Sequence, residues 1–221
     1  MYGYSEGSIA EINIHENLVN LANMARDSLK VFNEIVDNLV SDIDVGRLYS
    51  RILELKSRIE DNKLLFMEYL VRLGEGLPYK QSYATIALGF ERFTQLLDGA
   101  SYRLTILKSR RLEISSEIYR YIAMFKDIVN EQFRNIFEGL RLLYSDPKKT
   151  LTRISEVSKL ENRADEVYRN ATFSLYTEYG TKVLTLMTLR DILDFIENAA
   201  DLLRSLGEEL RYLALHRIVV G

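Results

Sequence analysis

Two short acidic motifs in the second half of the chain have the residue types and spacing of a metal-binding site. The segments KLENRADEV and DFIENAADLL each contain a glutamate followed four residues later by an aspartate, Glu161 with Asp165 and Glu197 with Asp201. Residues four apart lie on one face of an α-helix, with Cβ atoms about 6 Å apart, so both carboxylates of a motif can reach one cation. Carboxylate oxygens are the ligands that hard divalent cations prefer.

The spacing of the two motifs predicts that they lie level in a helical hairpin. Their centres, Arg163 and Ala199, lie seventeen residues before and nineteen residues after Gly180. At about 1.5 Å per residue, both motifs of an antiparallel helix pair would lie about 25–28 Å from the turn. Asp194 shares the face of the second motif. The predicted metal ligands are therefore Glu161, Asp165, Asp194, Glu197 and Asp201.

Each motif borders the apolar stripe of its helix. The stripes are formed by Val157, Leu160, Ala164, Val167 and Ala171 in one helix and by Leu189, Leu193, Ile196, Ala200 and Leu203 in the other. Carboxylates that converge beside these stripes would be partly buried and would repel one another, which raises their pKa values. A bound cation relieves that repulsion. The candidate ions are iron, Mn²⁺, Mg²⁺, Ca²⁺ and Zn²⁺.

The residues alone leave a site without metal open as an alternative. Arg163, Arg190 or Arg204 could neutralise these carboxylates as salt bridges on solvated helix faces. Ferritin-like di-iron chemistry is disfavoured because it uses Glu-x-x-His pairs, whereas His15 and His216 lie near the chain ends, where we expect them at the surface. The sequence contains no glycine-rich phosphate loop, nucleophile elbow or Ser-His-Asp set, so we do not expect an enzyme.

Six helices are predicted to position these motifs, because apolar residues at three- and four-residue steps alternate with helix breakers and caps. They cover residues 8 or 16–40, 46–73, 81–107, 112–144, 147–179 and 181–217. In the first half, residues 41–44 supply N-cap candidates, and Gly74, Gly76 and Pro78 end the second helix. In the second half, Asp146 is an N-cap with Pro147 at the first helical position. Gly180 is expected as a left-handed C-cap and Thr181 as an N-cap.

These helices form two sets of three that are related by a shift of about one hundred residues. Apolar matches such as Phe32 with Phe133 and Ile52 with Ile154 accompany matched breaks and the acidic match of Glu60 with Glu161. We therefore predict an all-α fold of two tandem, pseudo-repeated three-helix bundles. The halves would cover residues 1–109 and 110–221.

The first half retains only part of the acidic pattern. Glu60 is followed four residues later by Leu64, and Asp98 is preceded four residues earlier by Thr94, so each motif lacks one carboxylate. Glu60, Glu91 and Asp98 would form a weaker second site.

Composition limits the classes of function. The net charge of −3 gives no reason to expect nucleic acid as a partner, and the local basic cluster of Lys108, Arg110 and Arg111 fits an inter-helix junction better than a phosphate site. The chain contains no cysteine, which excludes disulfides and thiolate metal sites. No basic start with an apolar run and no stretch of ~20 apolar residues is present, so we expect a cytoplasmic protein without a membrane span.

Tandem three-helix bundles with E-x-x-x-D motifs on adjacent helices resemble the PhoU-like proteins, in particular the smaller branch associated with Pit-type phosphate transporters. The resemblance covers residues 18–217 and is carried best by LENRAD and FIENAAD. It implies two metal clusters, of which the sequence supports one. It also implies regulation of inorganic phosphate uptake through contact with a transporter or its signalling components. We accordingly expect a homo-oligomer or a docking surface for a membrane transporter.

Two readings from other classes remain open. The first is a structural or scaffolding bundle without metal, whose acidic groove binds basic side chains of a partner. The second is a membrane-surface protein of the curved three-helix type, which would require a basic concave face that the sequence does not indicate.

Overall fold

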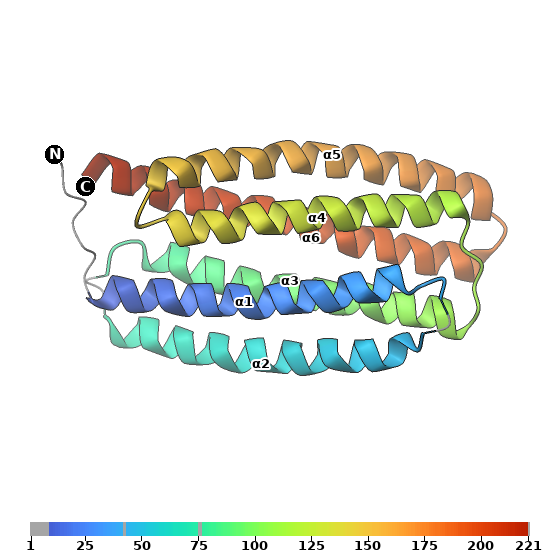
Figure 1. Ribbon diagram of the computed structural model, residues 1–221, viewed down its shortest axis with the longest axis horizontal. Coiled ribbons are helices and arrows are strands. Elements are labelled where there is room, and N and C mark those ends of the chain that lie inside the picture. Colours follow the sequence, from blue (N-terminus) through green and yellow to red (C-terminus); the bar gives the residue numbers. More distant parts are fainter. Residues whose placement is uncertain (1–8, 42, 75–76, 221) are drawn as a thin grey trace.

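The computed structural model describes residues 9–41, 43–74 and 77–220, and over these residues it contains helices and no strands (Figure 1). The expected start at Ser8, the cap candidate Asp42 and the breaker Gly76 lie outside the described residues. The helices are α1 (Ile9–Asp37), α2 (Val45–Arg72), α3 (Lys80–Ser109), α4 (Ser116–Leu142), α5 (Pro147–Tyr179) and α6 (Val183–Val220). Each matches a helix predicted from the sequence.

The helices form two tandem three-helix bundles, α1–α3 and α4–α6, which confirms the predicted fold class. The bundles meet where α1 packs against α4 and α3 packs antiparallel against α6, while α2 and α5 lie on the two outer sides (Figure 1). The expected boundary between residues 109 and 110 falls at the end of α3. One hydrophobic core runs through both halves, so their independence as folding units stays a prediction.

Residues paired by the internal repeat have the same environment in the two halves. Phe32 and Phe133 are both buried, as are Ile52 and Ile154. The agreement follows from helix geometry, because a stripe of apolar residues at three- and four-residue steps can face only one side.

Most of the predicted helix ends are confirmed. The Asp44 carboxylate accepts a hydrogen bond from Gly46 N (2.9 Å), and the Asp146 carboxylate accepts one from Lys149 N (3.0 Å) with Pro147 in the first turn. These side chains satisfy backbone donors that have no partner within the helix. Gly74 has a left-handed φ of +70°, which a residue with a Cβ rarely adopts.

Two predicted features of the α5–α6 turn are wrong. Gly180 has φ −52° and ψ −27°, so it continues the right-handed conformation and does not form a left-handed cap. Helix α6 begins at Val183, so the residue before it is Lys182 and Thr181 lies outside the cap position. The turn is closed by a hydrogen bond from Lys182 N to Tyr179 O (2.9 Å), which a right-handed Gly180 permits.

Helix α4 begins four residues later than predicted. The Ser115 hydroxyl accepts a hydrogen bond from Ile118 N (3.2 Å) and thereby sets the start of the helix at Ser116. This cap could have been read from the sequence, because Ser115 is a preferred cap type and Glu117 adds an acidic residue to the first turn.

Two glycines allow α3 and α6 to approach closely. A Cβ at Gly89 would lie 2.2 Å from Leu206 Cδ2, and a Cβ at Gly99 would lie 2.4 Å from Phe195 Cε1. A larger residue at either position would force Leu206 or Phe195 to move, so glycine permits the packing seen between the two halves.

The basic cluster at the C-terminal end of α3 belongs to an inter-helix junction, as expected. Lys108 Nζ donates hydrogen bonds to Asn38 O (2.7 Å) and Ser41 O (2.6 Å). These carbonyls follow the end of α1, where a cation also interacts favourably with the helix dipole. Among the described residues, none of the helices is both long and apolar enough to cross a bilayer.

The expectation that both histidines lie at the surface is wrong. His15 is half-buried, its Nε2 lies 2.8 Å from Leu140 O, and its ring lies 4.8 Å from the ring of Tyr144. Burial lowers the pKa of His15. His216 is also half-buried, with its ring 4.2 Å from that of Tyr79. Both lie against other helices because the ends of α1 and α6 pack on the bundle.

Candidate metal centre

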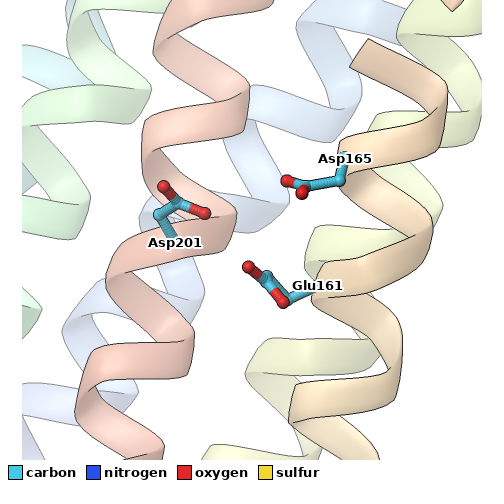
Figure 2. Close-up of side chains that lie close together, drawn as sticks. All are labelled: Glu161, Asp165 and Asp201. Carbon is cyan, nitrogen blue, oxygen red and sulfur yellow. The ribbon is translucent and has the colours of Figure 1, made fainter. Parts of the chain in front are cut away.

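Three carboxylates converge between α5 and α6. Glu161 and Asp165 project from α5 toward Asp201 on α6 (Figure 2), and one carboxylate oxygen from each lies within 4.8 Å of the other two. Among the described residues this group can hold a metal ion, and it combines members of both E-x-x-x-D motifs.

The donor set suits a hard divalent cation. Oxygens bound to one Ca²⁺, Mg²⁺ or Mn²⁺ lie about 2.0–2.6 Å from the ion, so any two of them must lie within about 5 Å of each other. The three carboxylates meet this condition without any backbone movement. Their all-oxygen chemistry favours Mg²⁺, Ca²⁺ or Mn²⁺ over metals that select sulfur or imidazole.

The helix faces explain why these side chains meet. The apolar stripes predicted for α5 and α6 are buried, and the acidic residues lie at their edges. Glu161 is only 7% exposed, whereas Asp165 is half-buried and Asp201 exposed. The candidate centre therefore has a buried inner carboxylate and an outer side that remains open to solvent.

The cluster is electrostatically strained in the way the sequence predicted. Burial raises the pKa of Glu197 to about 6, and the carboxylates of Asp201, Asp165, Asp194 and Glu161 add to this effect in that order. Burial also raises the pKa of Asp201, helped by Asp165 and opposed by Arg204. Glu197 thus shares the electrostatic environment of the three converging carboxylates, although it stands outside their closest group.

Arginine neutralises part of the cluster, as the alternative without metal requires. Arg204 Nη1 lies 2.7 Å from Glu161 Oε1. Arg169 lies 3.9 Å from Asp165 in an exposed pair, which contributes little to stability. Arg163 is exposed. One guanidinium therefore binds the inner carboxylate, while Asp201 and Glu197 keep raised pKa values.

Asp194 is engaged elsewhere. Its Oδ1 accepts hydrogen bonds from the Tyr168 hydroxyl (2.6 Å) and from Arg190 Nε (2.9 Å), and Arg190 also contacts Tyr176. Burial and Asp194 raise the pKa of Tyr168, which keeps its hydroxyl protonated as a donor. Ligation by Asp194 stays a prediction, and its Oδ1 already has these two partners. Tyr168 was not singled out from the sequence because a lone tyrosine on a helix is usually a packing residue.

The first-half residues do not form a matching group. Glu60 is exposed, Glu91 pairs with Lys63 (3.1 Å) and Asp98 pairs with Lys56 (2.6 Å). Within the described ranges, Glu60, Glu91 and Asp98 are not brought within joint reach of one ion. Metal binding at this second site stays a prediction that the geometry does not favour.

Stability of the metal-free protein should fall as pH rises through the acidic range. The folded-state pKa of Glu197 is about 6, above its ordinary 4.5, so the folded chain binds this proton more tightly than the unfolded chain. The corresponding stability is present below pH 4.5 and is lost as pH rises to about 6. Since Glu197 is only half-buried, we expect a loss of about 1 kcal/mol after allowance for screening.

Melting temperatures measured in a chelator between pH 4.5 and 7 test this expectation. Other carboxylates also titrate there, so the informative quantity is the difference between the wild type and Glu197→Gln. The variant should lose less stability over this range, whereas Glu166→Gln, on the exposed side of α5, should follow the wild type. Parallel profiles for all three proteins would show that Glu197 is not strained.

The chain combines two tandem three-helix bundles with one acidic centre between its last two helices. This combination can be compared with proteins of known family or known structure. No protein-family model and no curated protein matches the sequence.

Solved PhoU structures share the fold. PhoU from Pseudomonas aeruginosa superposes with a TM-score of 0.77 at 16% identity, covering 96% of this chain and 98% of that one. The phosphate transport system regulatory protein PhoU from Streptococcus pneumoniae gives 0.74 at 13% identity, with coverage of 92% and 96%. A PhoU-like protein from Shewanella oneidensis gives 0.63 at 14% identity, with coverage of 91% and 99%. This chain therefore has the PhoU fold over nearly its whole length.

Proposed function

We propose that this chain is a PhoU-like regulatory or accessory protein of inorganic phosphate uptake that binds a divalent metal ion and acts through protein–protein contact. The observation that carries the proposal is the convergence of Glu161, Asp165 and Asp201 within a PhoU fold. The solved protein from Streptococcus pneumoniae is described as a phosphate transport system regulator, and the proposal extends that role to this chain.

The residues of α5 and α6 have separate roles in this proposal. Glu161, Asp165 and Asp201 provide the first ligands, and Glu197 is close enough to share their field. A bound metal ion would neutralise Glu161 and so weaken its attraction to Arg204. The guanidinium of Arg204 would then become available to solvent or to a partner. Metal would thereby change the charge of the outer face of the α5–α6 pair without a change of fold.

The proposed partners are a phosphate transporter, the Pit type included, or its signalling components, at the cytoplasmic side of the membrane. The sequence resemblance supports the Pit type. A tagged wild-type chain should retain such a component from detergent-solubilised membranes of its own host, and a chelator should weaken that retention. Recovery of RNA or DNA without any transporter or kinase component would contradict the proposal.

A scaffolding bundle without metal is the second candidate. The specific observation that favours it is that Arg204 and Arg190 already pair with Glu161 and Asp194. Elemental analysis of the purified protein and calorimetric titration with Mn²⁺ separate the two candidates. Light scattering of the same sample determines whether the proposed homo-oligomer forms.

A further inference from the structure

We propose that Lys56 and Lys63 act as tethered cations in the first half, where they neutralise the acidic residues of the degenerate site and leave no place for a metal. Lys56 Nζ lies 2.6 Å from Asp98 Oδ2, and Lys63 Nζ lies 3.1 Å from Glu91 Oε2. Both pairs connect α2 to α3, the counterparts of α5 and α6. In each half, a positive charge would thus compensate the acids between the last two helices.

The pairs differ from ordinary surface salt bridges in their burial. The side chains of Lys63 and Glu91 are each 12% exposed and Asp98 is 15% exposed, while Lys56 is 36% exposed and is the more solvent-exposed member of its pair. Water and salt screen such pairs weakly, and loss of one partner leaves a poorly solvated charge. Lysines with solvated partners provide the contrast, since Lys30 and Lys159 are both more than half exposed in their pairs with Asp27 and Glu156.

A tyrosine completes the first-half arrangement. Tyr49 donates a hydrogen bond from its hydroxyl to Asp98 Oδ1 (3.0 Å), so both oxygens of this carboxylate are bound. Burial, together with the Asp98 charge, raises the pKa of Tyr49 to about 12, which keeps the donor protonated. A metal at Asp98 would therefore have to compete with a partner that is already bound to each oxygen.

The internal repeat shows how the two halves differ at this place. With Glu60 aligned on Glu161, a shift of 101 residues, Lys56 aligns with Val157, Lys63 with Ala164 and Leu64 with Asp165. With the shift of 102 residues that pairs Ile52 with Ile154, Lys56 aligns with Ser158 and Lys63 with Asp165. Neither shift aligns the two lysines with a cation of the second half, and neither aligns Asp165 with an acidic residue of the first half. The first half therefore carries two cations where the second half carries none.

The metal part of this inference rests on the proposed function. Metal would act on this protein through α5 and α6 alone, and the structure of the first half would not depend on metal. The lysine part rests only on the contacts of α2 and α3. The two parts can therefore fail separately.

A thermodynamic cycle on the full chain tests the lysines. Lys56→Met with Lys63→Met should lower the melting temperature by roughly 5 °C in the presence of a chelator, because Glu91 and Asp98 lose their counter-charges. Adding Glu91→Gln and Asp98→Asn to the same chain should recover more than half of that loss, because the uncompensated charges are then removed. The matched control Lys30→Met with Lys159→Met should change the melting temperature by less than about 2 °C.

The same variants exclude a purely structural explanation. Loss of packing alone predicts that the four-fold variant is no more stable than the lysine variant, and that outcome would overturn the proposal. An unchanged melting temperature in the lysine variant would overturn it as well.

Calorimetric titration with Mn²⁺ tests the metal part. Asp165→Asn with Asp201→Asn should abolish all binding, since the first half offers no site. Residual binding that requires Glu91 and Asp98 would overturn the proposal that the first half has no metal site. If the wild type binds no Mn²⁺, the proposed metal centre fails, and the lysine cycle still decides whether Lys56 and Lys63 compensate the first-half acids.

Discussion

Divalent metal should raise the melting temperature of the wild-type chain by about 5–10 °C and leave the Asp165→Asn, Asp201→Asn double variant unaffected. A ligand at one hundred times its dissociation constant stabilises the folded state by about 2.7 kcal/mol, and for a chain of this length each kcal/mol corresponds to roughly 2–4 °C. The double variant removes one proposed ligand from α5 and one from α6 while preserving side-chain volume.

The physical reason is that a bound cation changes the net electrostatic interaction of the clustered carboxylates from repulsion to attraction. Without metal, Glu197 and Asp201 have raised pKa values because burial and neighbouring carboxylates disfavour their charged forms. A cation attracts the same charges that otherwise repel one another. The apparent affinity should therefore rise with pH between about 5 and 7, as the ligands lose their protons.

Two controls make the result specific. Glu156→Gln with Glu166→Gln removes two acidic residues from α5 outside the converging group and should leave the metal response intact. Arg204→Gln frees Glu161 from its guanidinium, so this variant should be less stable in chelator and should bind metal more tightly than the wild type. A wild-type melting curve that ignores Mg²⁺, Mn²⁺ and Fe²⁺, in a protein that contains no metal, would favour the scaffolding function.

Phe133→Ala should lower the stability of the whole chain by about 3–5 kcal/mol, which corresponds to a fall in melting temperature of roughly 10 °C. Phe133 on α4 is 1% exposed, and its ring stacks on that of Phe93 on α3 at 5.2 Å, with Phe90 at 6.2 Å. These aromatic contacts cross from one three-helix bundle to the other. The substitution leaves a cavity that the closely packed helices cannot fill by collapse.

The matched control for this prediction is Phe173→Ala, because Phe173 is 76% exposed and its loss should change stability by less than about 0.5 kcal/mol. Since the core is continuous, calorimetry should show one transition that shifts as a unit. A second transition that stays at the wild-type temperature would mean that the bundles unfold independently.

The helices and the location of the candidate site were predictable because both depend on local geometry. An α-helix has a fixed rise and a period of 3.6 residues, so the stripes and the breaks define the elements. The same rise places Glu161 and Asp201 level across the hairpin once a single turn separates their helices. The start of α4 was harder to predict, because the apolar residue Leu112 and the cap residue Ser115 both suggested a start. Helix α4 begins at Ser116, later than expected.

The conformation of Gly180 and the burial of His15 could not be read from the sequence. A glycine after a helix is compatible with both left- and right-handed backbone, and the choice depends on how α6 returns against α5. His15 lies near the end of the chain, but Leu140 of α4 and Tyr144, just after α4, lie against it. Both outcomes depend on residues far away in the sequence.

By itself, the sequence determined the all-helical fold, its two-fold internal repeat and the acidic residues that line the α5–α6 pair. Only the tertiary structure decided which charge meets each carboxylate: Arg204 for Glu161, Arg190 with Tyr168 for Asp194, and Lys56 and Lys63 for the first-half acids. The reason is physical. A long side chain spans several ångströms and can reach partners on two neighbouring helices, so its partner depends on how those helices pack and not on its position in the repeat.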